Sequence, residues 1–426
     1  MAVAFGLTRL AVSLDCSPIE IQAFYKITTK QVDLIKCPFI AVVVNIIRLP
    51  VYMQKYFREL IEGKRTGLQA DVLRFMLSCC EKPYFVASST RNAFYDRGWF
   101  RSRQVPIPIV SVGNLTLGGT GKTPMVAYLV KWFLSHKIRP GIVSRGYKKP
   151  SDSKTPGKLN DEGMELEIRF PEVPHLQSPD RIAASLALLQ KYPVDVIVLD
   201  DGFQHRRIAR NLDIVLIDSL EPFGLDRLFP RGTLRESLHS LSRADVVLIS
   251  RADMVDESRR NEIQSRVRKF TPNAIIGEVI HKPTSLIAHY EETPQTDSSL
   301  FSDMSTFTVR QTCSVAWLAG KKIVAFSGIA RPEAFRKSLE RCGANVLEFV
   351  HFPDHHDFSS SDVERLTAIA KAANAAAVLC TMKDIVKIRK RNLDNVPLWS
   401  VEIGLEFQSG EEQFAGKLRS IVVAGG

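Results

Sequence analysis

The sequence predicts an α/β protein with two parallel-sheet domains, preceded by an amphipathic N-terminal helical region. From residue 107 onward, apolar runs rich in β-branched residues alternate with segments of helical periodicity, which is typical of parallel strands joined by crossover helices. A polar stretch at residues 291–312 interrupts this alternation, which then restarts. The restart indicates a second α/β domain.

The elements follow one another along the chain. In the first domain we expect strands at residues 107–112, 141–144, 194–199, 213–217 and 245–249, and helices at 125–136, 181–191 and 258–270. In the second we expect strands at 323–327, 345–352, 376–379 and 396–401, and helices at 332–342 and 361–373. Residues 148–157 are predicted to form a surface loop. The predicted organisation is an extension (1–70), a first domain (71–290), a linker or insert (291–320) and a smaller domain that closes a cleft (321–426).

The composition limits the class of protein. With 45% hydrophobic and 24% charged residues in 426, the chain is typical of globular proteins. Its seven cysteines include no C-x-x-C pair, which favours a reducing compartment over structural zinc. The net charge is +11, and residues 1–105 hold 15 Lys and Arg against 8 Asp and Glu. Because no basic motif interleaved with aromatic residues appears, we expect a membrane surface and not a nucleic acid as the anionic partner. A basic surface without a partner is the alternative.

The N-terminal region carries short apolar segments. None reaches the ~18 uninterrupted apolar residues of a spanning helix. Residues 38–47 and 73–85 favour helices that lie at a membrane interface, and core-facing helices are the alternative. Glu81, Lys82 and Pro83 interrupt the apolar run of the second segment. The first fourteen residues hold Arg9 and no acid, as in an organelle-targeting leader, whereas Asp15 and Glu20 count against a leader.

A glycine-rich run, V-G-N-L-T-L-G-G-T-G-K-T-P at residues 112–124, follows an expected strand and opens an expected helix. This context predicts a phosphate-binding loop, and hence a first domain of the P-loop NTPase type that binds a nucleoside triphosphate. Lys122 is expected to reach the outer phosphates and Thr123 to ligate Mg²⁺. Thr116 stands where the usual pattern has its first glycine. The residues expected to bind the nucleotide here are Gly118, Gly119, Thr120, Gly121, Lys122 and Thr123.

A second apolar strand, residues 194–199, runs into Asp200 and Asp201. In a P-loop protein such a strand delivers a carboxylate to Mg²⁺. Both acids are expected to serve as metal ligands, because Gly202 allows the strand to end there; a simple strand-end turn is the alternative. Gln204 and His205, which follow Phe203, are expected to donate to phosphate oxygens.

Three signatures in order, V-G-N-L-T-L-G-G-T-G-K-T-P, D-D-G-F-Q-H and F-P-D-H-H, resemble the tetraacyldisaccharide 4'-kinases. The resemblance covers about residues 72–405. It implies a membrane-associated enzyme that transfers the γ-phosphate of ATP, with Mg²⁺, to the 4'-hydroxyl of an anionic glycolipid, the lipid A disaccharide precursor.

The resemblance also implies roles for residues outside the loop and the metal strand. Asp161, in Asn-Asp-Glu-Gly, matches the family's candidate catalytic base, and His355 matches a second-domain histidine that assists it. Arg235 matches an arginine near the phosphates. A carboxylate is a chemically suitable acceptor for the proton of an attacking sugar hydroxyl. The neighbour His356 is the alternative to His355, and both residues could instead be ordinary loop residues.

The chain departs from the family pattern at several places. Arg231 and Thr233 replace Ala and Pro, Met382 replaces a glutamate, and Ala330 and Arg331 replace Gly and Asn. These changes alter bulk or charge near the expected cleft, so they affect which acceptor binds more than which reaction takes place. The chain also begins well before the family's usual start, which favours a eukaryotic, plant mitochondrial copy. The cytoplasmic face of a bacterial inner membrane is the alternative location.

Two other functions compete with a kinase. Residues 245–253 end in Ser250-Arg251-Ala252-Asp253, which is similar to the guanine-reading motif of GTPases, so a membrane-bound GTPase is one rival. A catalytically idle membrane-binding module is the other.

Overall fold

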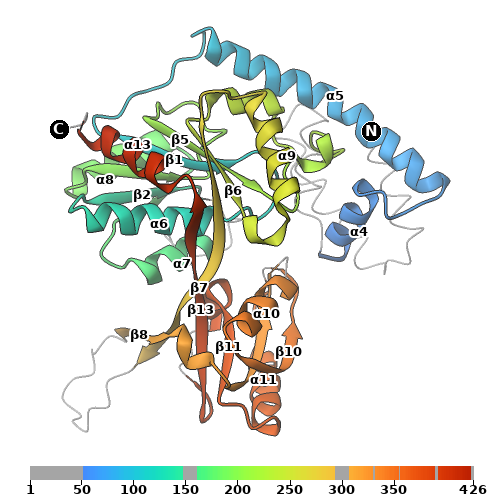
Figure 1. Cartoon of the computed structure of the whole chain (residues 1–426), viewed down its shortest axis with the longest axis vertical. Helices are drawn as coiled ribbons and strands as arrows, with labels where there is room; N and C mark the ends of the chain where they lie inside the picture. The colour runs from blue at the N-terminus through green and yellow to red at the C-terminus, as the bar shows by residue number, and fades with distance from the viewer. Residues whose placement is uncertain are drawn as a thin grey trace, which may run out of the picture. The chain divides into compact units, whose positions relative to one another are not determined.

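The computed structural model describes residues 51–146, 161–292, 307–329, 332–354, 356–388 and 392–423 (Figure 1). These residues form two compact units. One unit contains the described residues up to Ala93 together with Phe223–Ser237, and the other contains Phe94–Pro222 and the described residues from Leu238 onward.

The first unit consists of two helices and the segment 223–237. The helices are α4 (Val51–Ile61) and α5 (Leu68–Asp96). The Tyr84 ring lies 6.3 Å from the Phe229 ring, and its hydroxyl donates to the main-chain oxygen of Arg235 at 2.7 Å. The Glu81 carboxylate accepts the N–H of Leu228 at 2.8 Å. One side of α5 therefore holds the segment in place.

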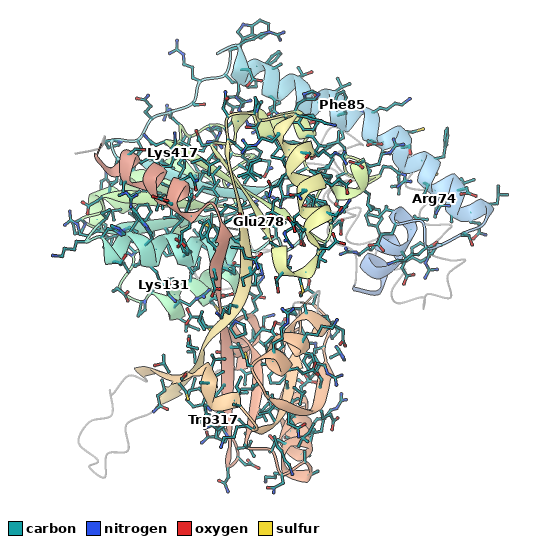
Figure 2. The ribbon with its side chains drawn as sticks, in the orientation of Figure 1. Arg74, Phe85, Lys131, Glu278, Trp317 and Lys417 are labelled. Atoms are coloured by element: carbon teal, nitrogen blue, oxygen red, sulfur yellow. The ribbon has the colours of Figure 1, made fainter. Side chains whose placement is uncertain are left out.

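The other side of α5 exposes apolar side chains. Leu68, Val72 and Phe75 are 81%, 50% and 70% exposed, and Val86, three turns after Phe75, is 60% exposed. Figure 2 labels Arg74 and Phe85 on this helix. The expected helix at 73–85 is thus part of a longer one, which continues through Pro83 although proline removes a main-chain hydrogen bond. The segment at 38–47 lies outside the described residues.

One sheet runs through the second unit and contains thirteen strands of the described residues, ordered β10-β9-β11-β13-β7-β6-β5-β1-β4-β2-β3, with β12 on β13 and β8 on β7. Its pairs are parallel except β7–β13, β7–β8 and β12–β13. The strands are β1 (Ile109–Asn114), β2 (Pro140–Ser144), β3 (His175–Gln177), β4 (Val196–Asp200), β5 (Leu212–Asp218), β6 (Val246–Ser250), β7 (Ile275–Glu292), β8 (Phe307–Ser314), β9 (Lys322–Ser327), β10 (Asn345–His351), β11 (Ala377–Thr381), β12 (Asn392–Leu393) and β13 (Val396–Ser409).

Two lobes share this sheet. The first lobe comprises β1–β6 with α6 (Lys122–Ser135), α7 (Asp161–Arg169), α8 (Arg181–Lys191), α9 (Glu257–Arg268) and α13 (Glu411–Val423). The second lobe comprises β9–β11 with α10 (Pro332–Arg341), α11 (Ser360–Ala372) and α12 (Met382–Ile388). The long strands β7 and β13 pair along residues 278–287 and 400–409, and they carry the sheet from one lobe into the other (Figure 1).

Apolar side chains cover both faces of the sheet in each lobe, as expected for buried parallel strands. In the first lobe, Phe133 of α6 and Phe414 of α13 pack on one face, and Leu188 of α8 packs on the other. In the second lobe, Leu366 of α11 packs on one face and Leu339 of α10 on the other.

The expected α/β class with a mostly parallel sheet is confirmed, with differences in detail. The expected loop at 291–312 was wrong at both ends, because β7 extends to Glu292 and β8 begins at Phe307. The expected loop at 148–157 lies outside the described residues. The sequence did not predict β7, whose Gly277 and Pro283 obscure any strand alternation.

None of the helices in the described part of the chain combines the length and the apolar composition needed to cross a membrane.

Candidate active site

The glycine-rich run forms a loop between the end of β1 and the start of α6. Gly118 and Gly121 have φ of +111° and +94°, a conformation that side chains other than glycine rarely adopt. A Cβ on Gly121 would also lie 2.3 Å from Nε2 of His281 on β7. Gly121 is the residue that caps α6, and no side chain bonds to the first N–H groups of the helix there. The first N–H groups of a helix, when no side chain caps them, are suited to binding an anion.

Side chains beneath this loop hold its main chain. Asn114 donates to the oxygen of Thr116 at 2.9 Å. Ser250 donates to the oxygen of Thr120, and Arg251 to the oxygen of Gly119, each at 2.8 Å. Ser250 and Arg251, whose sequence is similar to part of a guanine-reading motif, thus support the glycine-rich loop, a role that the sequence did not indicate.

The last residue of that motif is also engaged. Asp253 forms an ion pair with Arg341 of α10 at 2.6 Å. Arg251 forms a second ion pair with the buried Asp218, also at 2.6 Å. The motif therefore contacts the loop and the second lobe.

Lys122 lies between the ends of β1 and β4. Its ammonium is 3.3 Å from Oδ1 of Asn114 and 3.4 Å from Oδ1 of Asp201. Gln204 donates to the main-chain oxygen of Asn114 at 2.8 Å. Thr123, the next residue, is buried. The structure thus brings together the loop lysine, the second carboxylate of the metal strand and the expected glutamine.

The two carboxylates of the metal strand have different environments. Asp200 is buried, and its Oδ1 has no hydrogen-bond partner in the part of the chain that the structure describes. Burial, followed by the nearby charge of Glu162, raises the pKa of Asp200 to about 7. Asp201 has a φ of +50°, and a Cβ on Gly202 would meet Oγ of Ser111 at 2.5 Å. The strand therefore ends in a tight turn, as expected, and leaves a buried carboxylate oxygen available for a cation.

Two acids at the start of α7 meet two lysines of α12. Asp161 forms an ion pair with Lys387 at 2.9 Å, and Glu162 forms one with Lys383 at 3.1 Å. Burial opposes ionisation of Glu162, but the charges of Lys383 and then Lys122 outweigh it and lower the pKa of this carboxyl. Sequence reasoning missed both lysines, although their spacing of four residues on a helix places them on one face.

His355 lies outside the described residues, whereas His356 is described. The ring of His356 stacks on that of Phe352 at 4.8 Å, and its Nε2 lies 3.0 Å from the Asp362 carboxylate. The main-chain oxygen of His356 accepts a hydrogen bond from Lys387 at 3.1 Å. The imidazole of His356 therefore holds this segment against the start of α11.

Two other expected residues have contacts of their own. Nδ1 of His205 is 3.5 Å from Nη1 of Arg181 at the start of α8. Arg235 belongs to the first unit, where Tyr84 binds its carbonyl oxygen. Its role near the phosphates stays a prediction.

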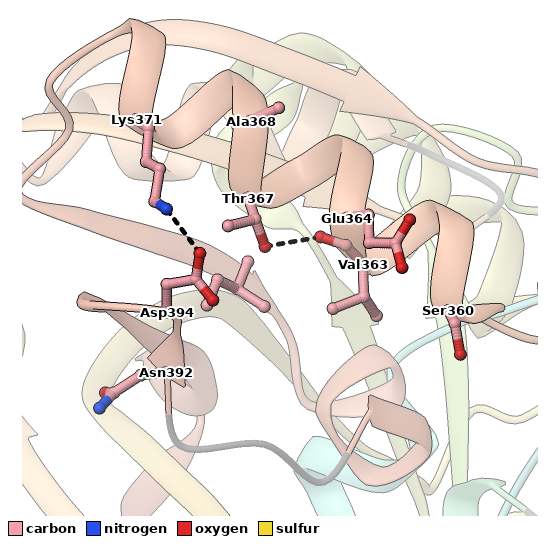
Figure 3. Close-up of a pocket in the computed structure, with 9 residues that line it drawn as sticks. Ser360, Val363, Glu364, Thr367, Ala368, Lys371, Asn392 and Asp394 are labelled. Atoms are coloured by element: carbon pink, nitrogen blue, oxygen red, sulfur yellow. Dashed lines mark hydrogen bonds and ion pairs between the residues drawn. The ribbon is translucent and has the colours of Figure 1, made fainter.

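A surface hollow of about 710 Å³ lies in the second lobe between α11 and β12 (Figure 3). Lys371 and Asp394 form an ion pair across it at 2.6 Å. None of the residues described above lines this hollow, so it is not part of the site.

Comparisons with known proteins decide the family. The sequence model of the tetraacyldisaccharide-1-P 4'-kinases matches residues 73–422, most of the chain. The chain belongs to the tetraacyldisaccharide 4'-kinase family. The family expected from the three motifs is thereby confirmed.

Individual members of the family agree with this. The tetraacyldisaccharide 4'-kinase of Syntrophus aciditrophicus is 38% identical over 324 residues, which are 72% of this chain and 82% of that protein. The one of Halothermothrix orenii is 30% identical over 374 residues, 83% of this chain and 95% of that protein. The crystal structure of the "apo" form of LpxK from Aquifex aeolicus in complex with ATP matches with a TM-score of 0.59 and 26% identity, over 82% of this chain and 99% of that one.

Proposed function

We propose that this protein transfers the γ-phosphate of ATP to the 4'-hydroxyl of tetraacyldisaccharide 1-phosphate, as the names of its family and relatives imply. The observation that carries this proposal is the cluster of Lys122, Asp201 and Glu162 at the glycine-rich loop. In a member of this family, these groups have the chemistry that phosphoryl transfer requires, namely cations and metal ligands around the phosphates.

The nucleotide half of the site is the loop with the end of β4. Gly118, Gly119, Thr120 and Gly121 supply N–H groups for the phosphates, and Lys122 exchanges Asp201 and Asn114 for phosphate oxygens. Gln204 and His205 remain candidate ligands of the nucleotide.

A magnesium ion fits this half of the site. Its proposed ligands are the hydroxyl of Thr123 and the carboxylates of Asp200 and Asp201, and the buried, unpartnered Oδ1 of Asp200 supports the assignment. Among the described residues, no group of three or more His, Cys, Asp or Glu side chains is arranged to hold a metal ion. That is consistent with Mg²⁺, which keeps waters and phosphate oxygens among its ligands. When bound, the ion neutralises the charge of the transferring phosphate.

The acceptor half of the site is centred on α7. We assign the role of general base to Asp161, which takes the proton of the 4'-hydroxyl as its oxygen attacks the γ-phosphorus. Glu162, the next residue, forms an ion pair with Lys383. The assistance of His355 and the phosphate contact of Arg235 complete the proposed set.

The exposed apolar side of α5 supports attachment to a membrane surface. Leu68, Val72 and Phe75 lie on one face with Lys82 nearby in sequence, a pattern suited to the interface of an anionic bilayer. An acceptor lipid with several acyl chains resides in such a bilayer. The mitochondrial location stays a prediction, because its leader lies outside the described residues. We propose no nucleic-acid partner.

The decisive experiment is transfer of ³²P from [γ-³²P]ATP to tetraacyldisaccharide 1-phosphate by the full chain with Mg²⁺. We expect label in the lipid, unlabelled GTP competing poorly, and no label with Lys122→Ala. Folded wild-type protein that labels no lipid would exclude the kinase, and strong competition by GTP would favour the GTPase. Flotation with anionic vesicles tests the membrane surface, and Phe75→Glu is expected to weaken it without changing ATP affinity.

A further inference from the structure

Lys387 makes two contacts that no motif of the sequence accounts for. Its ammonium pairs with Oδ2 of Asp161 at 2.9 Å and donates to the main-chain oxygen of His356 at 3.1 Å. The first contact reaches the first lobe and the second stays within the second lobe. The ammonium therefore connects the start of α7 to the chain that follows β10.

Both members of the ion pair are largely shielded from water. The side chain of Lys387 is 10% exposed and that of Asp161 is 23% exposed. An ion pair at this depth is screened less by salt than an exposed one. The contact is thus unlike the exposed ion pair of Lys371 with Asp394 on the surface of the same lobe.

The helix that carries Lys387 is fixed at its start. Asp384 is 1% exposed, its Oδ1 accepts the N–H of Gly328 at 3.1 Å and its Oδ2 accepts the hydroxyl of Thr381 at 2.6 Å. Ile385 and Val386 of the same helix are buried in the core of the lobe. Helix α12 therefore presents Lys387 from a rigid base.

The other contact of Lys387 is equally constrained. A Cβ on Gly328 would lie 3.0 Å from the main-chain oxygen of Pro353 and 3.4 Å from Cβ of His356. The His356 ring also stacks on the Phe352 ring, with centroids 4.8 Å apart. The main-chain oxygen of His356, which accepts the hydrogen bond from Lys387, is therefore held in a packed segment.

We propose that Lys387 is a positioning residue for phosphoryl transfer: its ammonium keeps the Asp161 carboxylate ionised and fixed relative to the main chain at His356. This inference rests on the proposed function, which assigns the base to Asp161. A neighbouring cation favours the charged form of a carboxylate, and only that form accepts a proton.

Lys387 transfers no proton in this reaction. The 4'-hydroxyl oxygen forms a bond to the γ-phosphorus while its proton passes to Asp161. The bond from the γ-phosphorus to the bridging oxygen breaks, and its electron pair leaves with ADP. The ammonium of Lys387 stays protonated throughout, and its contribution is the place and the charge state of the carboxylate. The neutral Asp161 then returns its proton to water.

The test compares Lys387→Met, Lys387→Arg and Asp161→Asn with the double variant of Asp161→Asn and Lys387→Met, in the full chain with saturating Mg²⁺ and ATP. Lys371→Met is the matched control, because it removes an exposed lysine of the same lobe. We expect Lys387→Met to lower kcat by about 10- to 100-fold, with KM for ATP within about twofold of wild type, because misplacing a reacting group costs this much. We expect Lys387→Arg to recover most of the loss and Lys371→Met to change nothing.

The double variant separates action through Asp161 from a general structural effect. If Lys387 acts through the carboxylate, Lys387→Met adds less than about twofold to the loss in Asp161→Asn, because coupled groups are not additive. A fully additive loss, or a Lys387→Met enzyme within twofold of wild type, overturns the inference. The inference is also overturned if Lys387→Arg has an unchanged Tm and yet loses as much activity as is expected of Lys387→Met. The arginine variant decides the question if the methionine variant fails to fold. Wild-type kcat in Asp161→Asn refutes the assigned base itself, a distinct outcome.

Discussion

The two lobes of the second unit contribute to the site through different kinds of contact. The first lobe places Lys122 at the end of the loop that follows β1 and Asp201 in the turn that follows β4, and β1 and β4 are neighbours in the sheet. The second lobe contributes Lys383 and Lys387, and Lys383 is separated from its partner Glu162 by 221 residues. The site residues of the first lobe thus lie in loops that directly connect its elements, whereas the second lobe supplies charged residues whose partners are distant in the sequence.

This difference has a physical origin. In a parallel sheet the carboxyl ends of adjacent strands meet at one edge, so loops after β1 and β4 are brought together by strand pairing alone. The partners of Lys383 and Lys387 on α7 are brought near only because β7 and β13 join the two lobes in one sheet. We therefore expect variants of the first lobe to abolish the reaction and variants of the second to weaken it.

The largest effect is expected from Lys122→Ala in the first lobe. Removing the cation that reaches the outer phosphates should lower kcat/KM on the order of 10³-fold or more. Lys191→Ala is the control, because Lys191 lies on α8 over the ring of Tyr192 and contacts no residue of the site. Activity of the alanine variant within tenfold of wild type would contradict the role of the loop and the ranking of the lobes.

The second effect combines activity with stability at Asp200. Asp200→Asn should lower kcat by about 10²-fold through loss of a metal ligand, and yet raise the Tm of the metal-free protein at pH 8. The pKa of Asp200 is raised from 3.8 to about 7 in the folded protein, so its ionisation costs stability as pH rises from about 4 to 7.

The sign of this pH dependence provides the check. At pH 8 the wild-type protein carries the buried charge and the variant does not, so the difference in Tm is largest. As the pH falls to about 4 and below, the wild-type carboxyl becomes protonated in the folded and the unfolded protein, and the difference in Tm disappears. Thermal unfolding at both pH values, without and with Mg²⁺, measures it. A variant with a lower Tm than wild type at pH 8 would show that Asp200 stabilises the empty site.

The third effect concerns the region where the lobes join. The Glu402 carboxylate on β13 is buried and accepts from Arg169 at 3.0 Å and from Lys131 at 2.9 Å. Glu402→Gln should lower the free energy of unfolding by about 1.5–3 kcal/mol, because the buried Arg169 loses one of its two charged partners and keeps only Glu165. Glu406→Gln, which breaks an exposed ion pair with Lys282 on the same strands, should cost less than about 1 kcal/mol.

The pH dependence of Glu402 has the opposite sign to that of Asp200. Burial opposes ionisation of Glu402, but the charge of Arg169 and hydrogen bonds from Ser285 and Lys131 lower its pKa from 4.5 to about 2. The stabilisation is therefore complete above about pH 4.5 and is lost as pH falls toward 2. Urea unfolding at pH 7 and pH 3 should show the difference between wild type and Glu402→Gln shrinking at the lower pH. If the difference in the free energy of unfolding is the same at both pH values, the loss of stability in Glu402→Gln comes from packing and not from charge.

The same contrast explains what the sequence could predict. The loop at residues 112–124, the pair Asp200 and Asp201, and Gln204 follow from motifs, because each motif encodes its own turn. The long strand β7 escaped prediction, and only the first part of β13, residues 396–401, was expected, since Pro283 and Gly404 interrupt their patterns. The sequence of Ser250 and Arg251 suggested a guanine reader as a rival function. It could not show their contacts with Thr120 and Gly119, because these contacts depend on the pairing of β6 with β5. Lys383 and Lys387 required the docking of α12 on α7, which no local pattern records.

The smallest effect is expected from Lys383→Met, and it tests how far the second lobe's two lysines differ. The Lys383 and Glu162 side chains are 31% and 40% exposed, against 10% and 23% for Lys387 and Asp161. A pair that water reaches contributes at most about 1 kcal/mol, so kcat should fall by no more than about fivefold. Single-turnover transfer to the lipid, with Lys387→Met measured alongside, checks this. A loss in Lys383→Met as large as that in Lys387→Met would mean that Lys383 leaves Glu162 and contacts the transferring phosphate, and the second lobe would then share the charge chemistry of the first.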